Sequence, residues 1–218
     1  MNIIAKVEKL VKLEMEKDTS GHDWYHVDRV RKMALLLSEK EGNGYSRSIE
    51  LAALLHDISD EKLNNSKEEG QQKLANILAC ISIDNHEKEQ IITIISSVGF
   101  KGGNGIFPES LDAKIVQDAD RLDAIGALGI ARTFAYGGSV GSPIYDPSLS
   151  IRQKMTEEEY RKNNSSSIHH FYEKLLKIKN LLHTDSARKI AEARHLFMES
   201  FLQEFYKEWN VQDEKYFN

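Results

Sequence analysis

Apolar residues recur at intervals of three and four along most of this chain, which is the spacing of helices that bury one face. No segment shows the strict alternation of apolar and polar residues that is typical of a strand. The pattern therefore predicts an all-α fold, a helical bundle without a sheet.

Turn-forming and capping residues set the limits of the expected helices. The first helix ends at the turn 18–21, a second runs from His26 to about Glu41, and three more begin at Ser46, Ser66 and Asp84. A long helix is expected from about 110 to 136, a short one after Thr156, and two final ones over 167–182 and from 184 to about 209. Residues 139–155, which hold two of the three prolines, are predicted to form an ordered loop.

Length and composition narrow the class of protein. The 218 residues suffice for one domain that buries its own core. A formal net charge of −5 argues against nucleic acid or an anionic membrane as partner. No leader pattern opens the chain and no apolar run approaches the roughly 20 residues of a membrane span, so we expect a cytoplasmic protein. The single cysteine, Cys80, excludes an intramolecular disulfide, and its apolar neighbours predict a buried thiol.

The most informative stretch joins an apolar helical run, 51–55, to the adjacent pair His56 and Asp57. A helix this apolar should be buried, so the imidazole and the carboxylate need partners in the interior. His26 adjoins another apolar helical face, and Asp118 and Asp120 lie within a third apolar-periodic segment. Imidazole nitrogens and carboxylate oxygens together form a ligand set for a divalent cation, and such a cation would compensate the buried charges.

The order of these groups, His, then His-Asp, then Asp on separate helices, closely resembles the HD superfamily of metal-dependent phosphohydrolases. The resemblance extends to the run Ala-Ala-Leu-Leu-His-Asp at 52–57, to Gln-Asp-Ala-Asp-Arg-Leu-Asp-Ala-Ile-Gly at 117–126, and to His-Phe-Tyr-Glu-Lys-Leu-Leu at 170–176. These motifs look like those of a subgroup of stand-alone bacterial HD hydrolases. The resemblance covers about 19–209 and implies a single HD domain, with a core over about 19–136 and a helical C-terminal extension over about 156–209.

The resemblance implies that His26, His56, Asp57 and Asp120 bind one divalent cation. Manganese suits two imidazoles and two carboxylates best, with Mg²⁺, Fe²⁺, Co²⁺, Ni²⁺ and Zn²⁺ as alternatives. Asp118 competes with Asp120 for the last position, and the Ala-Asp-x-Leu context favours Asp120. His22, four residues before His26, is expected to have a structural or supporting role.

Related HD nucleotidases carry a carboxylate three residues after the His-Asp pair, where it helps to activate or orient the attacking water. Asp60 holds that position here, and Glu61 is its alternative. A polyphosphate bound by an acidic protein also needs cationic donors. The candidates are Lys62, Lys101, Arg121, Arg132 and Lys174.

The expected function is hydrolysis of nucleotides, with a nucleoside or deoxynucleoside triphosphate cut to the monophosphate and pyrophosphate. A 5′-nucleotidase and a guanosine tetraphosphate hydrolase are alternatives, although the latter enzymes carry an asparagine where this chain has Ala124. A non-catalytic module that binds a nucleotide or a protein is the alternative from another class. An apolar face on the last helix would support a homodimer.

Overall fold

The computed structural model describes residues 2–15, 23–60, 63–100, 103–156, 158–159 and 165–212. Within these ranges the chain is helical with no strand, which confirms the predicted all-α class. The elements are α1 (Ile3–Met15), α2 (Trp24–Lys40), α3 (Arg47–Leu55), α4 (Lys67–Ala79), α5 (Asn85–Val98), α6 (Leu111–Asp123), α7 (Gly126–Ser139), α9 (Ser167–Glu173), the 3₁₀ helix η2 (Leu175–Leu181) and α10 (Asp185–Trp209).

Side-chain caps start several helices where the sequence predicts them. Ser46, Ser66 and Asp84 each accept a hydrogen bond from the backbone N–H three residues later, at the starts of α3, α4 and α5. Thr156 and Glu159 exchange the two hydrogen bonds of a capping box. Each such cap contributes about 1 kcal/mol to helix stability, so the starts of these elements are set locally.

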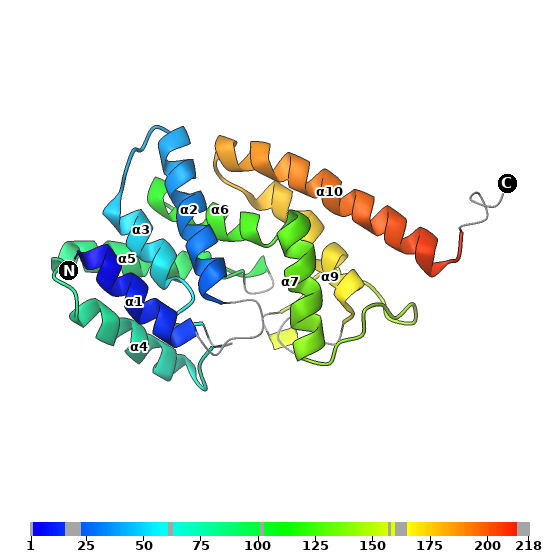
Figure 1. Cartoon of the computed structure of the whole chain (residues 1–218), viewed down its shortest axis with the longest axis horizontal. Coiled ribbons are helices and arrows are strands. Elements are labelled where there is room, and N and C mark those ends of the chain that lie inside the picture. The colour runs from blue at the N-terminus through cyan, green and yellow to red at the C-terminus, as the bar shows by residue number, and fades with distance from the viewer. Residues whose placement is uncertain are drawn as a thin grey trace.

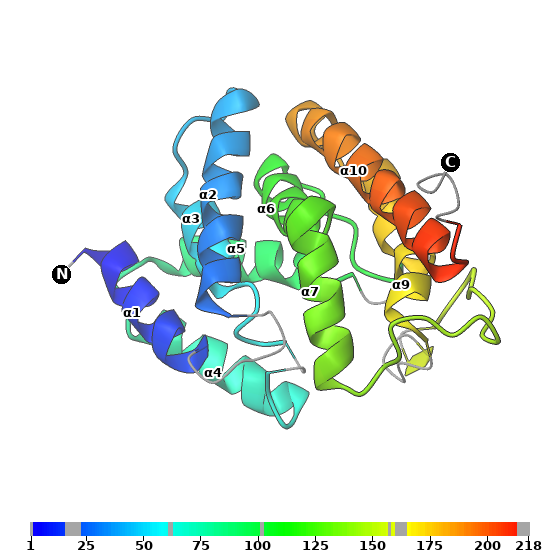
Figure 2. The same ribbon diagram turned by 45° about the vertical axis from the view of Figure 1, so that its right-hand side comes forward.

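Helix α3 lies at the centre of the bundle. All its residues from Ile49 to Leu55 are buried, and all of them except Glu50 are apolar, so this part of the helix has no face toward solvent. It packs on α1, α2, α5 and α6. Figures 1 and 2 show α1 to α5 on one side of the molecule, α6 in the middle, and α7, α9 and α10 on the other side. The end of α3 therefore delivers the residues that follow it into the interior.

The single long helix predicted over 110–136 is wrong, because the chain turns between α6 and α7. Ile125 is extended (φ −126°, ψ 164°) and Gly126 has a φ of +78°. Glycine adopts this left-handed conformation without a steric cost, and apolar periodicity continues across the break and hides it. The turn ends α6 at Asp123 and directs α7 away from it.

The continuous helix predicted over 167–182 is also wrong. α9 ends at Glu173, Lys174 is non-helical (φ −135°, ψ −61°), and residues 175–181 form a 3₁₀ helix. Its buried residues, Leu175 and Ile178, are three apart, a spacing that fits an α-helix and a 3₁₀ helix alike. Periodicity alone could not separate the two.

Three further expectations concern the surface. The buried thiol predicted at Cys80 is wrong, because Cys80 caps the exposed end of α4 while its apolar neighbours turn inward. None of the helices in the described ranges is both long and apolar enough to cross a bilayer. On α10, Leu196 and Phe197 are 60% and 53% exposed, and a dimer through this face stays a prediction.

The turn at Gly126 yields a test of the helix break. An alanine at this position would have to adopt the backbone φ of +78°. Its Cβ would also lie 3.0 Å from the side chain of Arg194. We expect Gly126→Ala to lower the free energy of unfolding by roughly 1–3 kcal/mol. Gly138→Ala is the matched control, because Gly138 lies in α7 with nothing near a new Cβ, and alanine there should be neutral or stabilising. Equal urea midpoints for the two variants would contradict the strained turn.

Candidate metal centre

Two histidines from different helices are held in the same tautomer. His56 follows α3, and its Nδ1 donates to the carbonyl of Ala53 at 2.8 Å. His26 lies in the first turn of α2, and its Nδ1 donates to Asp123 Oδ2 at 2.7 Å. Carbonyl and carboxylate oxygens only accept, so each ring carries a proton on Nδ1. In the neutral rings both Nε2 atoms therefore present a lone pair.

These Nε2 atoms face each other with carboxylates around them. The two nitrogens are 3.3 Å apart. Asp57 places Oδ2 3.2 Å from His26 Nε2 and Oδ1 3.3 Å from His56 Nε2. Asp120 Oδ1 lies 3.6 Å from His26 Nε2 and 3.8 Å from His56 Nε2. Three of the four residues expected to bind metal, His26, His56 and Asp57, thus satisfy the spacing of a metal-binding group, and Asp120 lies beside the two nitrogens.

The cluster has the electrostatics of a cation site. His26, His56 and Asp57 are all buried, and Asp57 Oδ2 has no hydrogen-bond donor among the described residues. The two nitrogen lone pairs face each other, and a buried carboxylate oxygen without a donor lies beside them. This arrangement costs free energy unless a positive charge lies between these atoms. An imidazole and carboxylate donor set fits a divalent first-row ion, so these residues fit the divalent cation expected from the sequence.

The same geometry binds a proton when no cation is present. Burial lowers the pKa of His56, but the charge and hydrogen bond of Asp57 and the charge of Asp120 together raise it to about 9. Burial raises the pKa of Asp57, but His56 and His26 hold it well below its usual range. A metal ion at this point must therefore displace a proton from His56.

Asp118, the alternative to Asp120, lies on another side of α6. Its fully buried carboxylate accepts hydrogen bonds from the backbone N–H of His183, at 3.0 Å, and from the N–H and hydroxyl of Thr184, at 2.7 and 2.8 Å. Residues two apart on a helix point about 200° away from each other. Asp118 therefore organises the chain before α10, while Asp120 faces the histidines.

Asp123 supports the cluster and was not assigned a role from the sequence. Its carboxylate accepts from His26, from Arg29 Nε and Nη2 at 2.7 and 3.0 Å, and from Arg132 Nη1 at 2.8 Å. Burial raises its pKa, but the hydrogen bonds from His26 and Arg29 outweigh burial and keep the pKa far below its usual range. The sequence did contain one indication of this role: Asp123 stands three residues after Asp120, which places the two carboxylates on neighbouring parts of one helical face.

The other predicted site residues do not gather into one group by their described contacts. Asp60 follows Asp57 by one turn, and its N–H donates to the Asp57 carbonyl at 3.0 Å. Arg121 donates to the Leu181 carbonyl, and Lys174 Nζ lies 4.9 Å from the centre of the Phe100 ring. Glu61, Lys62 and Lys101, together with His22, lie outside the described residues.

The chain is similar to known proteins in its sequence and its fold. The HD domain family model matches residues 23–125. The chain is 36% identical to Bacillus subtilis YpgQ over 193 residues, 88% of this chain and 86% of YpgQ.

Solved structures match over nearly the whole chain. A Lactobacillus plantarum protein has a TM-score of 0.87 at 37% identity and covers 96% of this chain and 97% of its own. An HD-superfamily hydrolase from Bacillus thuringiensis has a TM-score of 0.72 at 47% identity, covering 95% and 96%. YpgQ in complex with ADP has a TM-score of 0.74 at 33% identity, covering 94% and 97%.

The proton on His56 makes metal affinity depend on pH. Below the His56 pKa of about 9, a cation must displace that proton, so the association constant for Mn²⁺ should rise by about tenfold per pH unit. The rise should end above that pKa. Calorimetric titration of chelator-treated protein in buffers of different ionisation enthalpy should detect about one released proton per ion. A pH-independent affinity would contradict the protonated cluster.

Asp123 and Asp118 form a matched pair for mutation, because both are buried carboxylates of α6 but only Asp123 contacts His26. Asp123→Asn should weaken Mn²⁺ binding by roughly 10- to 100-fold, since the hydrogen bond to a metal-ligand histidine loses its charge. Asp118→Asn should instead reduce stability by roughly 1–3 kcal/mol and leave the Mn²⁺ affinity unchanged. The opposite pattern in calorimetry would return Asp118 to the candidate ligands.

Proposed function

The chain belongs to the HD-domain family, and from this we propose that it is a divalent-metal-dependent phosphohydrolase that acts on nucleotides. The observation that carries the proposal is the meeting of two Nε2 lone pairs and the Asp57 carboxylate at one buried point, with the partly exposed Asp120 carboxylate beside them. The nucleotide part of the proposal draws on YpgQ, which has been solved in complex with ADP.

His26, His56, Asp57 and Asp120 would hold the cation, and Mn²⁺ fits this mixed set best. When bound, such an ion supplies Lewis-acid polarisation of a phosphoryl oxygen and lowers the pKa of water at the site. The protein's own contribution is orientation, because Asp123 and the Ala53 carbonyl hold the two rings with their Nε2 atoms inward.

The exposure of the four side chains suggests where a substrate approaches. The imidazoles of His26 and His56 are each 1% exposed, whereas the Asp120 side chain is 28% exposed. Water and a phosphate group would therefore reach the cluster from the side of Asp120. The apolar surroundings of the histidines would keep bulk water away from the opposite side.

We assign the orientation of the attacking water to Asp60, with Glu61 as the alternative. Asp60 is half-buried and follows the His-Asp pair by one turn. The proposed phosphate-binding cations are Lys62, Lys101, Arg121, Arg132 and Lys174. Arg132 is the one of these whose described contacts adjoin the cluster, because its Nη1 binds Asp123 and leaves other N–H groups for a phosphate.

The proposed reaction converts a nucleoside or deoxynucleoside triphosphate to the monophosphate and pyrophosphate. The test is turnover of a panel of nucleotides by chelator-treated protein with and without Mn²⁺, with pyrophosphate and orthophosphate assayed separately. Pyrophosphate release is expected from triphosphates. Orthophosphate released from monophosphates would instead indicate a 5′-nucleotidase. Pyrophosphate released from guanosine tetraphosphate would indicate a guanosine tetraphosphate hydrolase.

Variants link the turnover to the cluster. His56→Ala and Asp57→Ala should each reduce the rate by at least about 100-fold, because each removes a group proposed to hold the ion. His86→Ala is the matched control, since His86 is an exposed histidine of α5, and it should retain the full rate. Absence of metal-dependent turnover for every nucleotide, despite a bound ion, would favour the non-catalytic binding module.

A further inference from the structure

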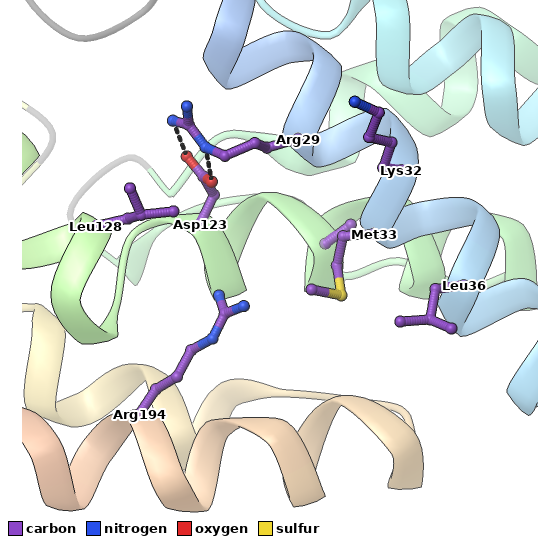
Figure 3. A pocket seen from close by; sticks show the side chains of 8 residues that line it. Arg29, Lys32, Met33, Leu36, Asp123, Leu128 and Arg194 are labelled. Atoms are coloured by element: carbon purple, nitrogen blue, oxygen red, sulfur yellow. Dashed lines mark hydrogen bonds and ion pairs between the residues drawn. The ribbon is translucent and has the colours of Figure 1, made fainter.

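A cavity separate from the histidine cluster lies between α2 and α10, against the end of α6 (Figure 3). Its volume is about 210 Å³. Neither histidine of the cluster lines it, nor does Asp57 or Asp120. Its one carboxylate is Asp123, which His26, Arg29 and Arg132 already share.

Positive charge gathers in this cavity. Arg29, Lys32 and Arg194 line it, so three cations face one carboxylate in a chain whose net charge is −5. Asp123 does not neutralise the other two cations, because its oxygens already accept from His26 and two arginines. Lys32 pairs instead with Asp28, which does not line the cavity, and Arg194 has no carboxylate partner among the described residues. The surplus charge comes from two helices far apart in the sequence, which suggests a recess for an anion.

Arg194 is the cation with the most unused hydrogen-bonding capacity. It reaches from α10 toward α6 (Figure 3), and its Nη1 donates to the Leu122 carbonyl at 2.5 Å. Its other guanidinium N–H groups have no acceptor among the described residues. Burial lowers the pKa of Arg194, and the charge of Asp123 offsets this only in part, so an anion would stabilise the buried cation.

Lys32 can turn toward the same recess. Its Nζ lies 2.6 Å from Asp28 Oδ2, but the side chain is 69% exposed, and an exposed ion pair of this kind contributes little. On the other walls, Met33, Leu36 and Leu128 are apolar. These apolar groups offer an anion no hydrogen bond, so the cationic side chains are the groups of the cavity that would hold it.

We propose that this cavity binds a phosphate-type oxyanion between Arg29, Lys32 and Arg194. Guanidinium groups match the geometry of phosphate oxygens through paired N–H donors. A cavity of about 210 Å³ is smaller than the roughly 300–1,000 Å³ of sites for drug-sized ligands. It therefore takes inorganic phosphate, pyrophosphate or the phosphate end of an ester, and not a whole nucleotide.

The experiment titrates chelator-treated wild-type protein with inorganic pyrophosphate and, separately, with inorganic phosphate by calorimetry. It does not depend on the proposed reaction, because no metal is present.

Lys32→Met and Arg194→Gln should each weaken binding by about tenfold, the loss expected for one charge-assisted hydrogen bond. Glutamine keeps a donor for the Leu122 carbonyl, and urea midpoints show whether each variant is folded. Lys40→Met, an exposed lysine on the same helix as Lys32, should change affinity by less than about twofold.

The two titrants identify the source of the oxyanion. Tighter binding of pyrophosphate supports a diphosphate ligand, and equal binding supports a single phosphate group. Lack of saturable binding to the wild type would overturn the proposal. So would binding that survives in both cavity variants but is lost in His56→Ala, because the oxyanion would then lie at the protonated histidines.

Discussion

The structure depends on one electrostatic constraint: two imidazoles and a carboxylate are buried at the centre of an apolar bundle. His26, His56 and Asp57 could not remain there without compensation, because an unpaired buried charge costs several kcal/mol. Each partner of this group is accordingly fixed. Ala53 and Asp123 bind the outer nitrogens of the rings, and the inner nitrogens share either a proton or, in the proposed function, a cation.

Helix α6 shows how one helix distributes carboxylates among different tasks. Asp118 binds the chain before α10, Asp120 faces the histidines, and Asp123 holds His26 together with Arg29 and Arg132. Helix α6 lies between the two halves of the molecule (Figure 1), and its carboxylates contact residues of both. Asp123 also lies between the histidine cluster and the cationic cavity, so the two sites share one carboxylate.

Whether this protein can bind a small anion depends more on where its charged residues lie than on its net charge. The net charge of −5 does not exclude a small anionic ligand. Cations concentrated in a recess attract an anion over a few ångströms, whereas the net charge acts at long range and is screened by salt. Arg29 and Arg194 come from opposite ends of the sequence and meet only because α10 folds back over α6. A search for basic runs along the chain could not reveal such a site.

The sequence by itself determined the helical class, the capped starts at Ser46, Ser66 and Asp84, and the family, because periodicity, caps and the His-Asp motif are local patterns. Only the tertiary structure decided the break at Gly126, the 3₁₀ turn after Lys174, the exposed Cys80 and the supporting role of Asp123. These features depend on what a residue contacts across the fold. Apolar spacing states which face of a helix is buried, but not where its axis bends or which distant group a buried carboxylate meets.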